Sequence, residues 1–152
     1  MTADPSVASP LDGHRVVGLD SNVFIYLFET AGDEAVQAGR VLDAIDTASI
    51  HATISTVAVA EILSGPARVA DIALMERYLD ELRSFERLSI VPVDVDIAFD
   101  AARSRGRDGI AMADSINLAA ARVAGATAFV TNDHRLSSAA GLAIIPLSAF
   151  AA

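Results

Sequence analysis

The sequence contains no cysteine, no tryptophan and no lysine, because all eleven of its basic residues are arginine. The lack of cysteine excludes a disulfide framework, a thiolate zinc site and a cysteine nucleophile. No run of 18 or more apolar residues is present, and the first fifteen residues lack the pattern of a secretory signal. These absences predict a soluble, cytoplasmic protein without a membrane span. They leave metal chemistry with oxygen or imidazole ligands open.

Positive charge is also scarce, since the formal net charge is −9. Broad, nonspecific binding to nucleic acid usually depends on a basic surface, so this balance counts against it. The objection is weak, because carboxylates grouped at one site become locally cationic when a divalent metal binds them. Net charge therefore does not exclude a nuclease.

The 152 residues, of which 53% are hydrophobic, suit one domain with a sizeable core. We expect a flexible tail over residues 1–15 and a single domain over residues 16–152. Short runs that are apolar on both faces, as in buried parallel strands, occur at residues 15–20, 50–55, 88–93, 126–131 and 142–147. Helical patterns separate them, so the sequence predicts an α/β fold with a central parallel sheet covered on both faces.

The helical patterns are bounded by recognisable end signals. They cover residues 33–48, 57–65, 67–88, 94–106 and 112–125. The second should end at the Gly65-Pro66 pair, and residues 67–88 should form one helix or two joined by a small break. The fourth should begin after Asp94 and close near Gly106.

Four acids stand out because of their positions relative to these elements. Asp20 and Asp133 follow the first and fourth expected strands, Glu61 lies in an apolar helix after the second strand, and Asp114 lies near the start of an Ala-rich helix. Ligands of parallel sheets bind at the carboxyl ends of strands. Each acid also has a plainer explanation: Asp20 as a helix cap, Asp114 as a partner of the helix dipole, and Asp133 as a turn residue. Glu61 in apolar surroundings must reach solvent or find a partner.

If the four carboxylates converge, a cation is needed to keep them ionised. Oxygen ligands without histidine or cysteine favour Mg²⁺ or Mn²⁺ over zinc. Such a site activates water and stabilises charge on a phosphate during in-line displacement. This set of acids therefore indicates phosphodiester hydrolysis.

Three stretches resemble the motifs of the PIN domain family, and within it the VapC-type toxins of bacterial toxin-antitoxin pairs. They are "GLDSNVFIYLF", "ISTVAVAEILSG" and "IAMADSINLAAARVAGATAFVTNDHRL". The resemblance implies a three-layer α/β/α fold with five parallel strands in the order 3-2-1-4-5. It implies that Asp20, Glu61, Asp114 and Asp133 bind Mg²⁺ or Mn²⁺ and that Asn22 and Thr131 support them.

The same resemblance implies a metal-dependent endoribonuclease toxin with an RNA substrate, a cognate antitoxin and a homodimeric state. The antitoxin would lie across the site and the helices near residues 67–88. Two alternatives stay open: a PIN fold that has lost catalysis and serves in assembly, and a phosphatase of the haloacid dehalogenase type. The phosphatase would need an acid two residues after Asp20, where this chain has Asn22.

Other polar residues near these motifs remain open. Asn117 departs from the apolar residue usual in the family and is either a partner of the acids or an exposed amide. His134 and Arg135 are interpreted as bystanders of Asp133. Either RNA contact or a solvated helix end would account for three arginines, Arg103, Arg105 and Arg107.

Overall fold

A computed structural model of the chain describes residues 8–136 and 141–151. Five parallel strands form one sheet in the order β3-β2-β1-β4-β5, as the sequence analysis predicted. The strands are β1 (Val16–Leu19), β2 (His51–Ser55), β3 (Leu88–Val91), β4 (Ala128–Thr131) and β5 (Ala143–Pro146). β1 pairs with β2 on one side and with β4 on the other, so the chain adds β2 and β3 in one direction from β1 and then β4 and β5 in the opposite direction. This reversal is the point at which parallel α/β sheets commonly bind ligands.

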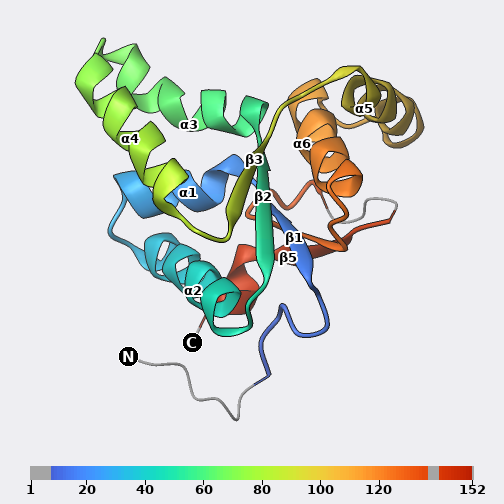
Figure 1. The fold of residues 1–152 in the computed structure, drawn as a ribbon, viewed down its shortest axis with the longest axis horizontal. Coiled ribbons are helices and arrows are strands. Elements are labelled where there is room, and N and C mark those ends of the chain that lie inside the picture. Colours follow the sequence, from blue (N-terminus) through green and yellow to red (C-terminus); the bar gives the residue numbers. More distant parts are fainter. Residues whose placement is uncertain (1–7, 137–140, 152) are drawn as a thin grey trace.

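Helices cover both faces of the sheet and complete three layers (Figure 1). They are α1 (Ser21–Glu29), α2 (Asp33–Thr47), α3 (Thr56–Arg68), α4 (Ile72–Ser84), α5 (Val95–Asp108) and α6 (Met112–Val123), followed by the short 3-10 helix η1 (Leu147–Phe150). The larger core joins the sheet to α1, α2, α3 and η1, with Phe24 and Ile54 fully buried within it. On the opposite face α6 packs against the sheet and α5 packs against α6. Within the described residues, no helix is long and apolar enough to cross a membrane.

Close packing on the α6 side depends on a glycine in β1. A Cβ atom at Gly18 would lie 2.6 Å from the Cβ of Ala121 and 2.8 Å from Cδ2 of Phe129. Real Cβ atoms do not approach other carbons so closely. Gly18 therefore allows α6 to lie directly against the central strand, which brings the start of α6 to the rim where β1 ends.

Two expected helix ends are wrong. Helix α3 continues through Gly65 and Pro66 to Arg68. Proline costs a helix one hydrogen bond and a clash with the preceding turn, and here it lies in the last turn, so that α3 continues for only two residues beyond it. The run at residues 67–88 therefore yields one helix, α4, which begins after the capping carboxylate of Asp71.

Helix α5 likewise passes Gly106 and stops at Gly109. The φ angle of Gly109 is 68°, the left-handed conformation that closes helices and that glycine adopts without strain. Gly106 has no such angle and remains helical. The start of α5 was predicted correctly, since the Asp94 side chain accepts a hydrogen bond from the Ile97 amide at 2.9 Å.

The segment before β1 contributes to the core. Leu11 is 1% exposed and belongs to the larger core cluster. The imidazole Nδ1 of His14 lies 2.7 Å from Oγ1 of Thr127. The described part of the segment expected as a tail, residues 8–15, thus contacts the domain, and residues 1–7 lie outside the described residues.

Candidate active site at the carboxyl edge of the sheet

Asp20 directly follows β1 and caps α1. Its amide donates to the carbonyl of Val130 at 3.0 Å, which extends the pairing of β1 with β4 by one residue. Its carboxylate accepts from the Ser21 amide at 2.8 Å and from the Thr131 hydroxyl at 2.7 Å. The side chain is 5% exposed. The capping interpretation is therefore confirmed, and the same bonds aim a buried carboxylate at the rim of the sheet.

The electrostatics of Asp20 are unusual for a surface cap. Burial raises the pKa of this carboxyl from 3.8 to about 6, against the lowering effect of the hydrogen bonds from Thr131 and Ser21. The negative charges of Glu61 and Asp114 raise the pKa further. The charges of two acids chosen from the sequence, Glu61 and Asp114, therefore act on the carboxyl of a third, Asp20, although the three belong to separate segments of the chain.

Thr131 and Asn22 link the two strand ends. The Thr131 hydroxyl donates to Asp20 and accepts from the Asp133 amide at 3.0 Å. The Asn22 amide nitrogen lies 3.5 Å from Oδ2 of Asp20 and 3.5 Å from Oγ1 of Thr131. Its oxygen accepts from the Asn132 amide at 3.3 Å. Both polar residues named from the sequence thus contact the groups that they were expected to support.

Glu61 has a partner that reaches it from another helix. Nδ2 of Asn117, on α6, donates to Oε1 of Glu61, on α3, at 3.0 Å. The oxygen of Asn117 accepts from the Ser55 hydroxyl, and Ser55 in turn caps α3 through the Ala58 amide. Asn117 is 4% exposed, so of its two interpretations the partner of the acids is correct. Its position three residues after Asp114 places both side chains toward the same rim.

Asp133 is held by an arginine that the sequence analysis interpreted as a bystander. The guanidinium of Arg135 donates to both carboxylate oxygens of Asp133, at 3.0 and 2.8 Å. This hydrogen bond is the main reason that the pKa of Asp133 lies below its ordinary value. Sequence spacing alone could not reveal the pair, since a two-residue separation in a turn fixes no side-chain direction.

The pKa of Asp114 depends on burial and on the charges of both Asp133 and Arg135. Partial burial raises the pKa of its carboxyl, the charge of Asp133 raises it further, and Arg135 lowers it. These charge effects connect Asp20 with Glu61 and Asp114, and Asp114 with Asp133. In the described part of the chain, however, no three acidic or imidazole side chains are gathered tightly enough to hold a metal ion as they stand.

The three arginines of α5 make local contacts. Arg103 pairs with Asp100 at 3.1 Å, and Arg107 pairs with Asp108 at 3.0 Å. Nε of Arg105 donates to the Ile110 carbonyl at 3.3 Å. All three side chains are exposed, and a contact of any of them with RNA stays a prediction.

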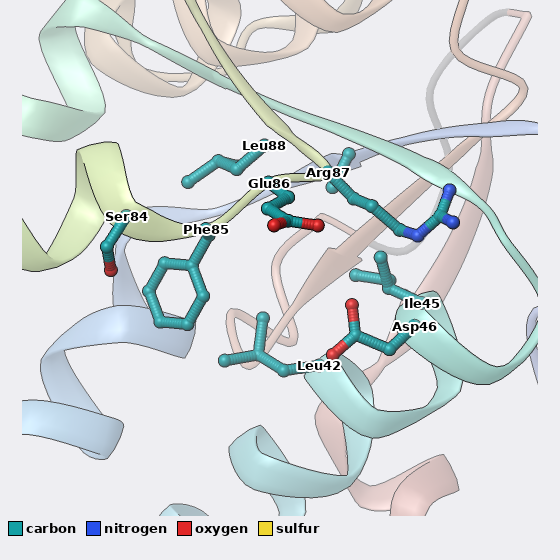
Figure 2. A pocket seen from close by; sticks show the side chains of 9 residues that line it. Leu42, Ile45, Asp46, Ser84, Phe85, Glu86, Arg87 and Leu88 are labelled. Atoms are coloured by element: carbon teal, nitrogen blue, oxygen red, sulfur yellow. The ribbon is translucent and has the colours of Figure 1, made fainter.

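A hollow of about 290 Å³ lies at the other edge of the sheet. It is bordered by Leu42 of α2, Phe85 after α4 and Leu88 at the amino end of β3 (Figure 2). Ala52, at the amino end of β2, also borders it. None of the four acids lines it. The chemistry at the carboxyl edge and this hollow are therefore separate features.

A model of the PIN domain family matches residues 17–142. The chain belongs to the PIN domain family. The match spans most of the described residues and includes all four acids. No curated protein matches the sequence.

Several solved structures resemble this PIN domain in fold. A VapBC2 complex from Rickettsia felis, bound to a DNA fragment from its promoter, matches with a TM-score of 0.69 and 19% identity, over 86% of this chain and 98% of the other. FitAcB from Neisseria gonorrhoeae matches with a TM-score of 0.67 and 24% identity, over 86% and 97%. VapC20 from Mycobacterium tuberculosis, described as a toxin that cleaves the sarcin-ricin loop, matches with a TM-score of 0.62 and 14% identity, over 82% and 97%. At these identities the likeness shows the fold alone.

Proposed function

We propose that this PIN domain is a divalent-metal-dependent endoribonuclease that acts as the toxin of a toxin-antitoxin pair. The observation that carries the proposal is the buried Asp20 carboxylate, which two hydrogen bonds hold in place and whose pKa is raised to about 6, in part by the charges of Glu61 and Asp114. A carboxylate held in this way lacks a cationic partner among the contacts described above. A divalent cation would supply one.

The donor set suits Mg²⁺ or Mn²⁺. Asp20, Glu61, Asp114 and Asp133 offer only carboxylate oxygens, the ligands that these cations prefer. When bound, the ion would lower the pKa of a water molecule and neutralise charge on the phosphate. The ion would have to bind with movement of side chains, because Asp133 is paired with Arg135.

The chain's own residues would fix the geometry of that reaction. Thr131 and the Ser21 amide hold Asp20 in one direction, and Asn117 holds Glu61. Asn22 ties the end of β1 to the end of β4 through Thr131 and the Asn132 amide. These bonds keep the carboxylates in place before substrate arrives, which is how a site saves reorganisation energy during reaction.

The partners follow from the family and the fold. We infer an RNA substrate, a cytoplasmic setting and a cognate antitoxin that covers the rim and the region of α3 and α4. Val69 and Ile72, at the junction of these two helices, are exposed apolar residues that such a protein would cover. The likeness to toxins solved in toxin-antitoxin complexes supports this inference.

The test is cleavage of structured RNA by the purified chain with Mg²⁺, with Mn²⁺ and with a chelator. Asp20→Asn and Asp114→Asn should abolish cleavage, whereas Asp43→Asn, at an exposed position of α2, should not. Equal activity of the wild type and the two site variants would reject the enzyme. A chain that cleaves no RNA with either metal but still binds an antitoxin would instead favour the non-catalytic PIN fold. No contact favours the phosphatase, since Asn22 uses its amide in the hydrogen-bond network.

A further inference from the structure

The hollow between α2 and the amino ends of β2 and β3 (the amino-edge hollow) has an apolar floor. Ile45 and Ala52 line it and are 3% and 2% exposed, and the half-buried side chains of Leu42 and Leu88 extend the same surface. Its volume of about 290 Å³ lies near the lower limit of ligand pockets, which hold roughly 300 to 1,000 Å³. The size of the amino-edge hollow therefore suits a small molecule.

The aromatic ring of Phe85 forms one wall of the amino-edge hollow (Figure 2). This ring packs on the ring of Phe24, with 5.7 Å between the ring centroids. Phe24 is fully buried in α1, and its ring centroid also lies 6.0 Å from that of Phe28. Such packing holds the Phe85 ring in place before a ligand arrives, which lowers the entropy cost of binding. The face of an aromatic ring held in this way attracts a cation.

Two carboxylates border the same space. Asp46 projects from the last turn of α2, and Glu86 follows α4. Figure 2 shows the Asp46 carboxylate reaching toward the hollow from one side and the Glu86 carboxylate lying across from it. Within the described part of the chain, neither carboxylate has an ion-pair partner. The amino-edge hollow thus presents two uncompensated negative charges above an apolar floor.

Arg87 alone carries a positive charge among the described residues that border the hollow. Its guanidinium extends past Ile45, on the side away from the Phe85 ring (Figure 2). The space between the ring and the two carboxylates therefore has no cation of its own. The net charge of −9 adds a long-range attraction for cations. Charge and shape together favour a ligand that is positive at its two ends and apolar between them.

We propose that the amino-edge hollow binds a small linear diamine, whose hydrocarbon chain covers the apolar floor and whose two ammonium groups face Asp46 and Glu86. A divalent metal ion fits less well, because it requires about six oxygen ligands and gains nothing from aliphatic side chains. A ligand with a single ammonium group would leave one carboxylate without a partner. The hollow lies at the opposite edge of the sheet from Asp20, so its ligand does not depend on the proposed nuclease activity.

Calorimetric titration of the metal-free chain with 1,5-diaminopentane tests the binding. Both amino groups of this probe are protonated at neutral pH, as the amino groups of lysine side chains are. The uncharged analogue 1,5-pentanediol should show no binding. Pentylamine, which has one ammonium group, should bind with a dissociation constant at least about twofold higher, because it lacks one exposed ion pair.

Two variants test the carboxylates. Asp46→Asn and Glu86→Gln should each raise the dissociation constant of 1,5-diaminopentane by about two- to fivefold, the effect of one exposed ion pair, and the double variant should raise it by about the product. Asp43→Asn is the matched control, since Asp43 is exposed on the same helix as Asp46 and does not line the hollow. It should leave the dissociation constant unchanged. Unfolding in urea shows whether each variant keeps the fold.

Amide chemical shifts locate the ligand, because the four acids at the carboxyl edge also carry negative charge. 1,5-Diaminopentane should shift the amide signals of Phe85 and Ala52 and leave those of Asp114 and Asp133 in place. Added Mg²⁺ at matched ionic strength should not reverse these shifts. The comparison separates the amino-edge hollow from the site of the proposed nuclease.

Any of four results would overturn the proposal. They are an absence of binding, a diol or monoamine that binds as tightly as the diamine, equal effects of Asp43→Asn and Asp46→Asn, and shifts confined to the carboxyl edge. A wild type that cleaves no RNA would reject the proposed nuclease and leave this site unaffected.

Discussion

Asn117 donates a hydrogen bond to Glu61 at 3.0 Å, although the two residues belong to different helices and are 56 positions apart. The bond has an ordinary length, is partly buried and is backed by Ser55. It fixes the direction of a carboxylate that would otherwise rotate freely at the end of a long side chain. The direction of the Glu61 carboxylate thus depends on α6 as well as on its own helix, α3.

Removal of this bond should impair the site more than the fold. Asn117→Ala should weaken Mn²⁺ binding or RNA cleavage by roughly 10- to 100-fold, as loss of a group that orients a metal ligand usually does. Asn132→Ala is the matched control, because the Asn132 side chain donates to the Tyr26 hydroxyl and not to an acid. Calorimetric titration with Mn²⁺ measures the change. Similar losses in both variants would mean that Asn117 acts only through stability.

Asp20 should make the metal-free protein less stable at neutral pH. Its carboxyl has a pKa of about 6 in the folded chain and an ordinary value of 3.8. Between these values the folded state holds a proton that the unfolded state has lost, so stability falls as pH rises through this window. The loss is about 3 kcal/mol and is complete above the folded value.

Asp20→Asn should remove that dependence. In urea unfolding with a chelator, the variant should be more stable than the wild type at pH 7.5, and the difference should shrink toward pH 4. Added Mn²⁺ should stabilise the wild type alone. A difference that does not change with pH would contradict the raised pKa.

Arg135 should compete with metal for Asp133. Arg135→Ala frees the carboxylate and removes a positive charge near Asp114, so the Mn²⁺ dissociation constant should fall by about two- to fivefold, the effect of an exposed ion pair. Arg83→Ala removes an exposed arginine at the end of α4 and should leave it unchanged. If RNA cleavage falls while metal binding improves, Arg135 also contacts the substrate. Unchanged metal binding would show that the pair is irrelevant to the site.

Gly18 should be intolerant of a side chain. Gly18→Ala should lower the free energy of unfolding by about 1 to 3 kcal/mol, because the new methyl group overlaps Ala121 and Phe129. Gly39→Ala, in α2 where a Cβ meets nothing within 4 Å, should raise it by about 0.5 to 1 kcal/mol. Chemical denaturation of both variants measures the contrast. Equal effects would show that α6 can move away from β1.

The sheet could be predicted because buried parallel strands are apolar on both faces. The runs around β1 and β4 showed this pattern clearly, and the acids that follow them marked the carboxyl edge. The end of α3 could not be predicted in the same way. A Gly-Pro pair usually stops a helix, but α3 passes this pair and ends two residues beyond Pro66.

Side-chain pairings at the rim were less predictable. Asn22 and Thr131 could be named in advance because the stretches that contain them resemble motifs of the PIN domain family. The bond from Asn117 to Glu61 depends on how α6 lies across α3, and the pair of Arg135 with Asp133 depends on the shape of one turn. Local sequence determines neither geometry. The binding of metal by the four acids stays a prediction.

The position of β1 between β2 and β4 has a consequence for the time at which the site forms during synthesis. Asp20 and Glu61 leave the ribosome early, but the hydrogen bond that orients Asp20 comes from Thr131, 111 residues later. A nascent chain that ends before Thr131 lacks both this bond and Asp133. A nascent chain that ends before Asp133 therefore cannot carry the complete set of acids, so any activity at this rim begins only after β4 has been made and paired.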